Sequence, residues 1–183
     1  VSGPREVAVR SDILITCVVD QTQTETVLRG TPDEPGALSG LRAGSSLIIM
    51  STLSPTYCHA LAEELAPRSI QMLDCPVSGG RARAEDASLA LICGGDPATV
   101  ERCRNVLDTM GTLTHCGGIG QGQVVKLINQ GLLFSTIRLV AEGRALGKAY
   151  GVDEGTLMAV LTLSTGQSTA ADNWDVFTAI WEH

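Results

Sequence analysis

Several short apolar runs, separated by segments that favour helices and turns, constrain the fold of this chain more than any other feature. The clearest are Ile13–Val19 and Ser46–Met50, which are rich in aliphatic residues and show no alternation with polar ones. Uninterrupted runs of this kind are typical of strands buried on both faces of a parallel sheet. Further runs lie at 70–73, 88–93 and 113–116. Because such runs alternate with helical segments, the sequence predicts an α/β layered sheet.

The pattern changes after Gly117, where proline-free helical segments replace the apolar runs. The expected helices are 121–150, 152–163 and 169–181. The sequence therefore predicts two parts in the 183-residue chain, an α/β domain over 1–117 and an incomplete all-helical domain over 118–183. The first of these helices would be about 45 Å long, which exceeds the diameter of a compact domain of this size. We therefore expect it to pack against a structure outside this chain, such as a second copy.

Charge and hydropathy narrow the range of partners. The net charge is −7, with 18% charged and 44% hydrophobic residues, which is an ordinary globular composition. An acidic chain is a poor nucleic-acid binder, whereas an anionic small molecule needs only a local positive site. We expect that no apolar stretch approaches the length of a membrane span, and no basic segment followed by an apolar run indicates a signal peptide.

The six cysteines form no CxxC pair, and none stands with histidine at metal-ligand spacing. Most lie inside apolar runs, so we expect buried, reduced thiols, no metal site and a cytoplasmic location. Both ends of the sequence look cut, because each lies in or next to an apparent helix.

The segment GGIGQGQVVKLINQ at 117–130 carries the first candidate site. On a helix, Lys126, Asn129 and Gln130 share one face, because residues three and four apart are neighbours. A lysine in a desolvated cleft works as a general acid or base, and amides bind carbonyl, hydroxyl or carboxylate groups. The alternative is an exposed lysine with polar neighbours on a helix surface.

The second candidate site is the strand end Asp74–Gly80. Ligands of open α/β sheets bind beyond the carboxyl ends of the strands. Ser78 offers a hydroxyl there, and Gly79 and Gly80 allow backbone N–H groups to approach an anion closely. Together they suit a carboxylate, although a tight turn that needs glycine for positive φ is the simpler explanation.

Three motifs in this order, DCPVSGG at 74–80, GGDPAT at 94–99 and GxGxxxKxxNQ at 120–130, resemble the β-hydroxyacid dehydrogenase family. That family includes 3-hydroxyisobutyrate dehydrogenase, tartronate semialdehyde reductase and 6-phosphogluconate dehydrogenase. The resemblance implies an α/β fold with a Rossmann-like parallel sheet whose first βαβ unit is missing. A long interdomain helix and an all-helical domain follow, and the helical domain forms a homodimer.

The resemblance also implies a reaction and its residues. The family moves a hydride between NAD or NADP and a small β-hydroxy acid or its semialdehyde or keto acid. The implied roles are catalytic acid/base for Lys126, substrate carboxylate binding for Ser78, Gly79, Gly80, Asn129 and Gln130, and cofactor binding for Val18, Val19 and Thr52.

The sequence also departs from the family pattern. No G-x-G-x-x-G follows a first strand, and Gly120–Gly122 is not the dinucleotide fingerprint because no complete βαβ unit surrounds it. Val19 stands where the family usually has proline. An alternative is therefore a non-catalytic truncated paralogue that binds a carboxylate or only dimerises. Imine reductases share the architecture, but they generally lack the lysine at the position of Lys126.

Overall fold

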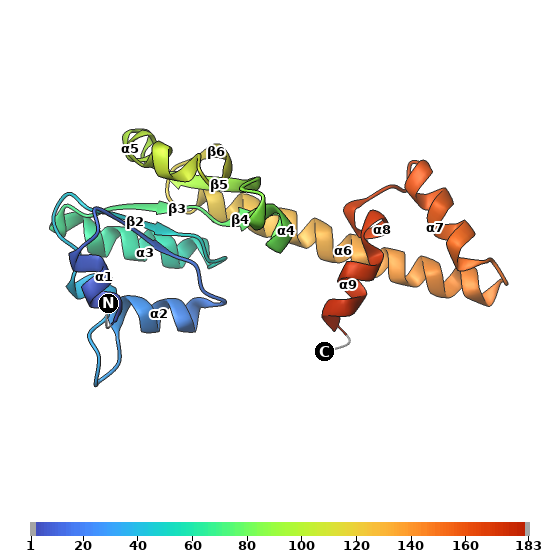
Figure 1. Cartoon of the computed structure of the whole chain (residues 1–183), viewed down its shortest axis with the longest axis horizontal. Coiled ribbons are helices and arrows are strands. Elements are labelled where there is room, and N and C mark those ends of the chain that lie inside the picture. Colours follow the sequence, from blue (N-terminus) through green and yellow to red (C-terminus); the bar gives the residue numbers. More distant parts are fainter. Residues whose placement is uncertain (1–2, 182–183) are drawn as a thin grey trace. The chain divides into compact units, whose positions relative to one another are not determined.

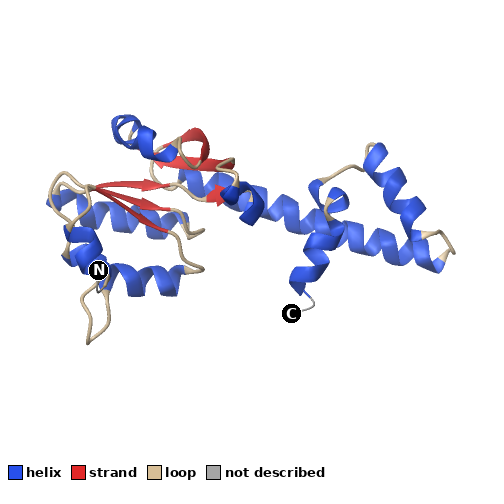
Figure 2. Cartoon of the chain, viewed as in Figure 1, coloured by secondary structure: helices blue, strands red, loops and turns tan. Residues whose placement is uncertain are grey.

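The computed structural model describes residues 3–181, and the chain forms two compact units, 1–127 and 128–183. The first contains a sheet with helices, and the second contains helices alone (Figure 2). The strands are β1 (Ile13–Thr16), β2 (Ser46–Ile49), β3 (Gln71–Asp74), β4 (Val77–Ser78), β5 (Leu89–Gly95) and β6 (Gly111–Gly117). The helices of the first unit are α1 (Pro4–Val9), α2 (Gln21–Arg29), α3 (Pro55–Leu65), α4 (Gly80–Glu85) and α5 (Pro97–Leu107), with 3-10 turns at Ala37–Ser39 and Ala66–Arg68. Helix α6 (Gln121–Ala149) begins in the first unit and continues into the second, which also holds α7 (Glu154–Leu163), α8 (Thr169–Asp172) and α9 (Trp174–Trp181).

The sheet confirms the predicted α/β, Rossmann-like class. Its strand order is β1-β2-β3-β5-β4, with β6 paired to β5. The pairs β1–β2, β2–β3 and β5–β6 are parallel, but β5 runs antiparallel to β3 and β4. The sheet is thus mixed rather than wholly parallel. Only residues 79–88 connect β4 to β5, which is shorter than a parallel crossover requires.

Both faces of the central strands are buried, as the lack of alternation predicted. Leu47 and Ile49 of β2 pack on one face with residues of α2 and α3, and Ile48 packs on the other with residues of α5. Figure 1 shows α2 and α3 on one side of the strands and α5 on the other. Each of these side chains is fully buried, which contributes about 1.5–3 kcal/mol apiece.

Strand β1 ends at Thr16, three residues before the predicted end at Val19. The backbone N–H of Val18 donates to Ser51 Oγ at 2.9 Å, and that of Val19 donates to Gln23 Oε1 at 3.1 Å. Both donors are therefore used in side-chain hydrogen bonds, and the segment after Thr16 forms a loop at the carboxyl edge of the sheet.

Polar caps start the helices of the sheet layer. The Asp20 carboxylate accepts the Gln23 N–H at 2.7 Å to begin α2, and Asp96 accepts the Thr99 N–H at 3.0 Å to begin α5. Such caps contribute about 1 kcal/mol each. Ser54 occupies the capping position of α3, but its hydroxyl makes no capping bond.

The second unit has its own small core. Ile137 and Val140 of α6 pack against Ala170 and Ala171 of α8. The single helix predicted over 169–181 is two helices, because Asn173 leaves the helical conformation at φ −127°. The predicted division into domains 1–117 and 118–183 stays a prediction, because the compactness of the two units does not show which function each of them has.

Helix α6 is long and apolar enough to cross a membrane by length and composition, so the prediction that no stretch approaches a span was wrong on those two counts. Its best 18-residue window has a mean hydropathy of 1.3 and is 17% buried. Every window of 18 residues in this helix contains Arg138, whose charge is costly in a bilayer. A single helix of this kind is weak support for a membrane span.

All six cysteines are free thiols. Cys58, Cys75, Cys93 and Cys103 are buried as predicted, whereas Cys17 is exposed and Cys116 is half-buried. The exposure of Cys17 follows from the early end of β1, which places it in the loop at the edge of the sheet.

The first turn of α6 lies directly on the sheet. A Cβ added at Gly122 would stand 2.4 Å from the Ile92 carbonyl oxygen and 2.8 Å from that of Asp74. Backbone atoms cannot yield as a flexible side chain can, so this contact requires glycine. Gly131, further along the same helix, has no atom within 4 Å of an added Cβ.

Gly122→Ala and Gly131→Ala form a matched pair that tests this contact. We expect Gly122→Ala to lower the free energy of unfolding by about 2 kcal/mol or more through overpacking. Gly131→Ala should leave stability unchanged or raise it by up to about 1 kcal/mol, because alanine favours the helix. Urea denaturation of both variants measures the difference, and equal stabilities would contradict the close packing.

Candidate active site

The candidate site forms where β1, β2 and β3 end. These parallel strands finish at Thr16, Ile49 and Asp74, so the three loops that follow lie along one edge of the sheet. Helix α6 begins at the same edge, since Gly122 lies against Asp74. This is the edge at which ligands of α/β sheets bind.

Asp74, the last residue of β3, anchors the start of α6. Its side chain is fully buried; Oδ1 accepts the Gly120 N–H at 2.7 Å and Oδ2 accepts the Gln123 N–H at 2.8 Å. The first N–H groups of a helix have no partner within it, and they favour a carboxylate. Asp74 thus caps α6 from a distant strand, which fixes the helix against the sheet.

Glycines make room for this carboxylate. A Cβ at Gly94 would lie 2.5 Å from Asp74 Oδ1, and one at Gly122 would lie 2.8 Å from Oδ2. Gly120 has φ +83° and would meet the His59 ring at 2.9 Å. The G-x-G at 120–122 therefore serves close packing around Asp74, which agrees with its exclusion as a dinucleotide fingerprint.

Burial raises the pKa of Asp74, and the hydrogen bonds from the Gly120 and Gln123 N–H groups oppose that increase. Desolvation is the larger of the two effects. The carboxylate is therefore costly to bury, and the two donors at the start of α6 offset part of the cost.

Gln123 connects α6 to the loop after β2. Its buried side chain accepts the Leu53 N–H at Oε1 and donates from Nε2 to the Ser51 carbonyl oxygen, each at 2.9 Å. Ser51 Oγ in turn accepts the Val18 N–H. The loops after β1 and β2 and the start of α6 thus form one hydrogen-bonded assembly.

Lys126 lies one turn beyond Gln123 and is only 6% exposed. Among the residues that the structure describes, it has neither an ion-pair partner nor a hydrogen-bond partner. Burial lowers the pKa of its ammonium group below the ordinary 10.5. The alternative of an exposed surface lysine is thereby excluded, and the side chain has the desolvated setting that acid/base chemistry needs.

The Ser78–Gly80 turn lies beside β5, where Ser78 pairs with Ala90. Ser78 is half-buried, and its hydroxyl makes no hydrogen bond within the described part of the chain. Gly79 has φ +134° and Gly80 φ +66°, so both use conformations that other residues rarely adopt. Gly80 is exposed with no atom within 4 Å of an added Cβ, which leaves open space beside its backbone.

The remaining predicted residues are placed as follows. Val18 and Thr52 are half-buried in the loops after β1 and β2, and Val19 is 82% exposed. Asn129 is exposed and Gln130 half-buried, and both belong to the second unit although they follow Lys126 on α6. Val18, Thr52, Ser78 and Lys126 thus share one unit, while the roles of all these residues stay predictions.

Asp74 and Gln123 are residues of the site that the sequence patterns do not indicate. Asp74 is only the first residue of one motif, and Gln123 lies inside another. One available signal was an acidic residue ending a buried strand, in a chain with glycine pairs before a helix. Such a residue must find donors, and the glycine-flanked helix start supplies them.

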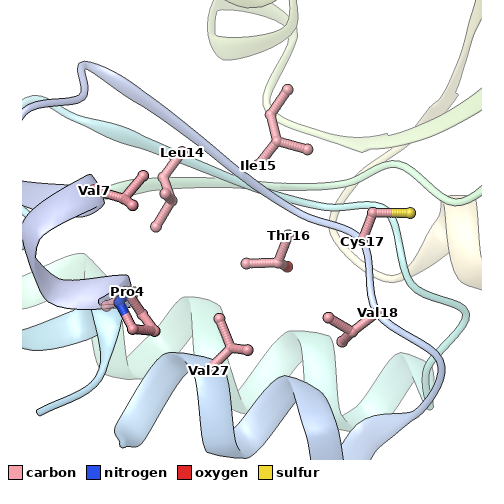
Figure 3. Close-up of a pocket in the computed structure, with 9 residues that line it drawn as sticks. Pro4, Val7, Leu14, Ile15, Thr16, Cys17, Val18 and Val27 are labelled. Atoms are coloured by element: carbon pink, nitrogen blue, oxygen red, sulfur yellow. The ribbon is translucent and has the colours of Figure 1, made fainter. Parts of the chain in front are cut away.

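A separate apolar pocket of about 300 Å³ lies against β1, α1 and α2 (Figure 3). It is lined by Pro4, Val7, Leu14, Ile15, Thr16, Cys17, Val18, Val27 and Ala37. The Thr16 hydroxyl is buried there without a hydrogen-bond partner among the described residues. Within those residues β1 pairs only with β2, so the pocket adjoins an open sheet edge.

Two family models match the chain. Residues 1–120 match the NAD binding domain of 6-phosphogluconate dehydrogenase, and residues 120–178 match the model described as NAD-binding of NADP-dependent 3-hydroxyisobutyrate dehydrogenase. The first match alone covers well over half of the chain.

Individual relatives agree with these matches. L-threonate dehydrogenase of Cupriavidus necator is 36% identical over 94% of this chain and 58% of its own length. The structure of Mycobacterium tuberculosis 3-hydroxyisobutyrate dehydrogenase with L-serine is 30% identical, with a TM-score of 0.80 over 94% of this chain and 57% of that one. The chain therefore spans somewhat more than half the length of these relatives.

A variant of the imine reductase from Myxococcus stipitatus, solved in complex with NAD+, also aligns. It is 24% identical, with a TM-score of 0.79 over 100% of this chain and 62% of that one. At this identity the likeness shows the shared fold alone.

Lys126→Met tests the burial of the ammonium group. Because burial lowers the pKa of Lys126 in the folded chain, the unfolded chain binds the proton more tightly. The free energy of unfolding therefore rises with pH between the folded-state pKa and 10.5. We expect the methionine variant to be more stable at pH 7 by roughly 1 kcal/mol or more, with the gain shrinking toward pH 10.5. Urea titrations across this range measure it.

The matched control is Lys148→Met, since Lys148 is exposed and is the only other lysine of the chain. Its stability should stay within about 0.5 kcal/mol of the parent. A Lys126→Met chain that is less stable than the parent at pH 7 would show that the ammonium group has a favourable partner.

Proposed function

The chain belongs to the β-hydroxyacid dehydrogenase family, and from this premise we propose that the whole protein is an NAD(P)-dependent oxidoreductase. It transfers a hydride between the nicotinamide and a small β-hydroxy acid or the corresponding semialdehyde or keto acid. The observation that carries the proposal is the buried side chain of Lys126, which has no partner among the described residues and lies at the sheet edge where such folds bind ligands.

The residues of this chain fit the nicotinamide end of the cofactor. The loops after β1 and β2, with Val18, Val19 and Thr52, stand at the carboxyl edge, and the Thr52 hydroxyl has no hydrogen-bond partner among the described residues. NAD or NADP supplies the hydride chemistry when bound. In the whole protein, we infer, a further part of the Rossmann domain covers the apolar pocket and pairs with the open edge of β1.

Lys126 acts as the acid/base. In the oxidative direction its neutral amine accepts the proton of the substrate hydroxyl, and in the reductive direction its ammonium donates a proton to the carbonyl oxygen. Burial supports this role, because a lowered pKa makes the neutral amine available closer to physiological pH.

The Ser78–Gly80 turn holds the substrate carboxylate, and the family pattern also assigns a substrate-binding role to Asn129 and Gln130. The Ser78 hydroxyl, which has no hydrogen-bond partner among the described residues, and the open backbone at Gly80 support this assignment. The relatives named above act on threonate and hydroxyisobutyrate or were solved with serine, and all three molecules are small hydroxy acids. We therefore expect a substrate of this class.

The helical part forms a homodimer in this account, and the protein works in the cytoplasm. Support for the dimer comes from large apolar side chains of α6 that stay exposed in the second unit. They include Leu132, Phe134, Leu139 and Leu146.

Two alternatives make different predictions. A non-catalytic paralogue that only binds a carboxylate or dimerises predicts no saturable NADH or NADPH binding by the whole protein. An imine reductase predicts turnover of a cyclic imine, and Lys126 argues against it on the family pattern stated above.

Lys126→Ala in the whole protein tests the acid/base role. We expect kcat to fall by about 10²–10⁴ with KM within several-fold of the parent, because the lysine acts on the proton rather than on binding. The assay follows NAD(P)H absorbance with L-threonate, 3-hydroxyisobutyrate and L-serine. Lys148→Ala is the control and should keep parental rates, whereas near-parental turnover by Lys126→Ala would refute the assignment.

A further inference from the structure

The side-chain amide of Gln123 is fully buried, and both of its ends bond to one loop. Oε1 accepts the Leu53 N–H and Nε2 donates to the Ser51 carbonyl oxygen, each at 2.9 Å. Its own backbone N–H donates to Asp74. Gln123 therefore joins the loop after β2, the end of β3 and the first turn of α6.

The two hydrogen bonds made by the Gln123 side-chain amide flank a single residue. Ser51 and Leu53 are the neighbours of Thr52, so Gln123 fixes the backbone on both sides of it. The Thr52 side chain has no hydrogen bond of its own within the described part of the chain. The position of its hydroxyl is thus set by the backbone that Gln123 holds.

Gln123 also lies three residues before Lys126, so the two side chains share a helix face. Both are buried on α6, at 0% and 6% exposure. A rigid helix turn keeps the spacing between them fixed. The same assembly extends to the loop after β1, because Ser51 Oγ accepts the Val18 N–H at 2.9 Å.

We propose that Gln123 is a positioning residue for hydride transfer. It holds the Thr52 loop, which is the loop after β2, at a fixed position relative to Lys126. The proposal rests on the function proposed above for Lys126 and Thr52. Gln123 touches neither substrate nor cofactor in this account; it fixes the distance between the residue beside the nicotinamide and the residue that moves the proton. Misplacement by about 1 Å at such a site costs up to about 100-fold in rate.

The test is steady-state kinetics on the whole protein with Gln123→Met. Methionine keeps the length of the side chain but removes both bonds to the loop. We expect kcat to fall roughly tenfold or more and KM for the nicotinamide cofactor to rise several-fold, measured on protein shown to be folded by circular dichroism. Gln121→Met, an exposed glutamine on the same turn, is the control and should keep parental constants.

Gln123→Glu serves as the second variant if methionine prevents folding. The glutamate keeps an acceptor for the Leu53 N–H and loses the donor to the Ser51 carbonyl, so we expect kcat to fall. Its carboxylate, one turn from Lys126, should also move the pH dependence of kcat to higher pH. A pH profile that stays parental would contradict the closeness of the two side chains on which the proposal rests.

A double-mutant cycle with Thr52→Val separates positioning from packing. If Gln123 acts through the Thr52 loop, the two substitutions change the cofactor KM by less in combination than the product of their single effects. Effects that multiply would overturn the proposal.

The outcomes also separate this inference from the proposed function. Parental kcat, KM and pH profile in both Gln123 variants, with Lys126→Ala inactive, would overturn the positioning role and leave the function standing. Parental turnover by Lys126→Ala would refute the function itself.

Discussion

The capping of α6 by Asp74 is the interaction on which the candidate site depends. A helix that starts at a sheet edge has N–H groups without partners, and a buried aspartate at the end of β3 accepts two of them. This places Lys126, one helical turn later, at the edge where β1 and β2 end and the loops after them begin. Without the cap, neither the carboxylate nor the helix start would have a partner in the interior.

The burial of the Asp74 carboxylate explains why glycines are concentrated around this side chain. Gly94 and Gly122 admit the Asp74 carboxylate at distances that any Cβ would block. The polar groups thus meet inside a closely packed layer, where hydrogen bonds are strong and unpaired groups are costly. Lys126 is the exception, since its side chain is only 6% exposed and has no partner among the described residues. Partial desolvation of a charged group lowers stability, and such a cost is typical of functional sites.

Much of the fold was predictable from local patterns. The buried runs at 13–16 and 46–49 and the extent of α6 follow from hydrophobic patterning. The antiparallel direction of β5 was not predictable in this way, because it depends on how the short segment after β4 turns back. The early end of β1 depends on the hydrogen bond from the Val18 N–H to the Ser51 hydroxyl, and these two residues are 33 positions apart in the sequence.

The site was predictable to a smaller extent. Lys126 and the Ser78–Gly80 turn could be proposed from the sequence because their residue types and motif order indicate a chemistry, and their roles stay predictions. Asp74 and Gln123 were missed because their partners lie 46 to 72 residues away, and no local pattern encodes such contacts. Residues that hold a site together are therefore harder to find from sequence than residues that perform its chemistry.

The most direct test of the central claim is the pKa of Lys126, measured by NMR on the whole protein with ¹³C-labelled lysine. Lys148→Arg and Lys126→Arg variants assign the signals of this chain, which has only these two lysines. We predict that the Lys126 Cε signal titrates below pH 10.5 because burial destabilises its ammonium group. A titration at or above pH 10.5 would contradict the account, because the lysine would then be solvated or paired and unsuited to acid/base catalysis near neutrality.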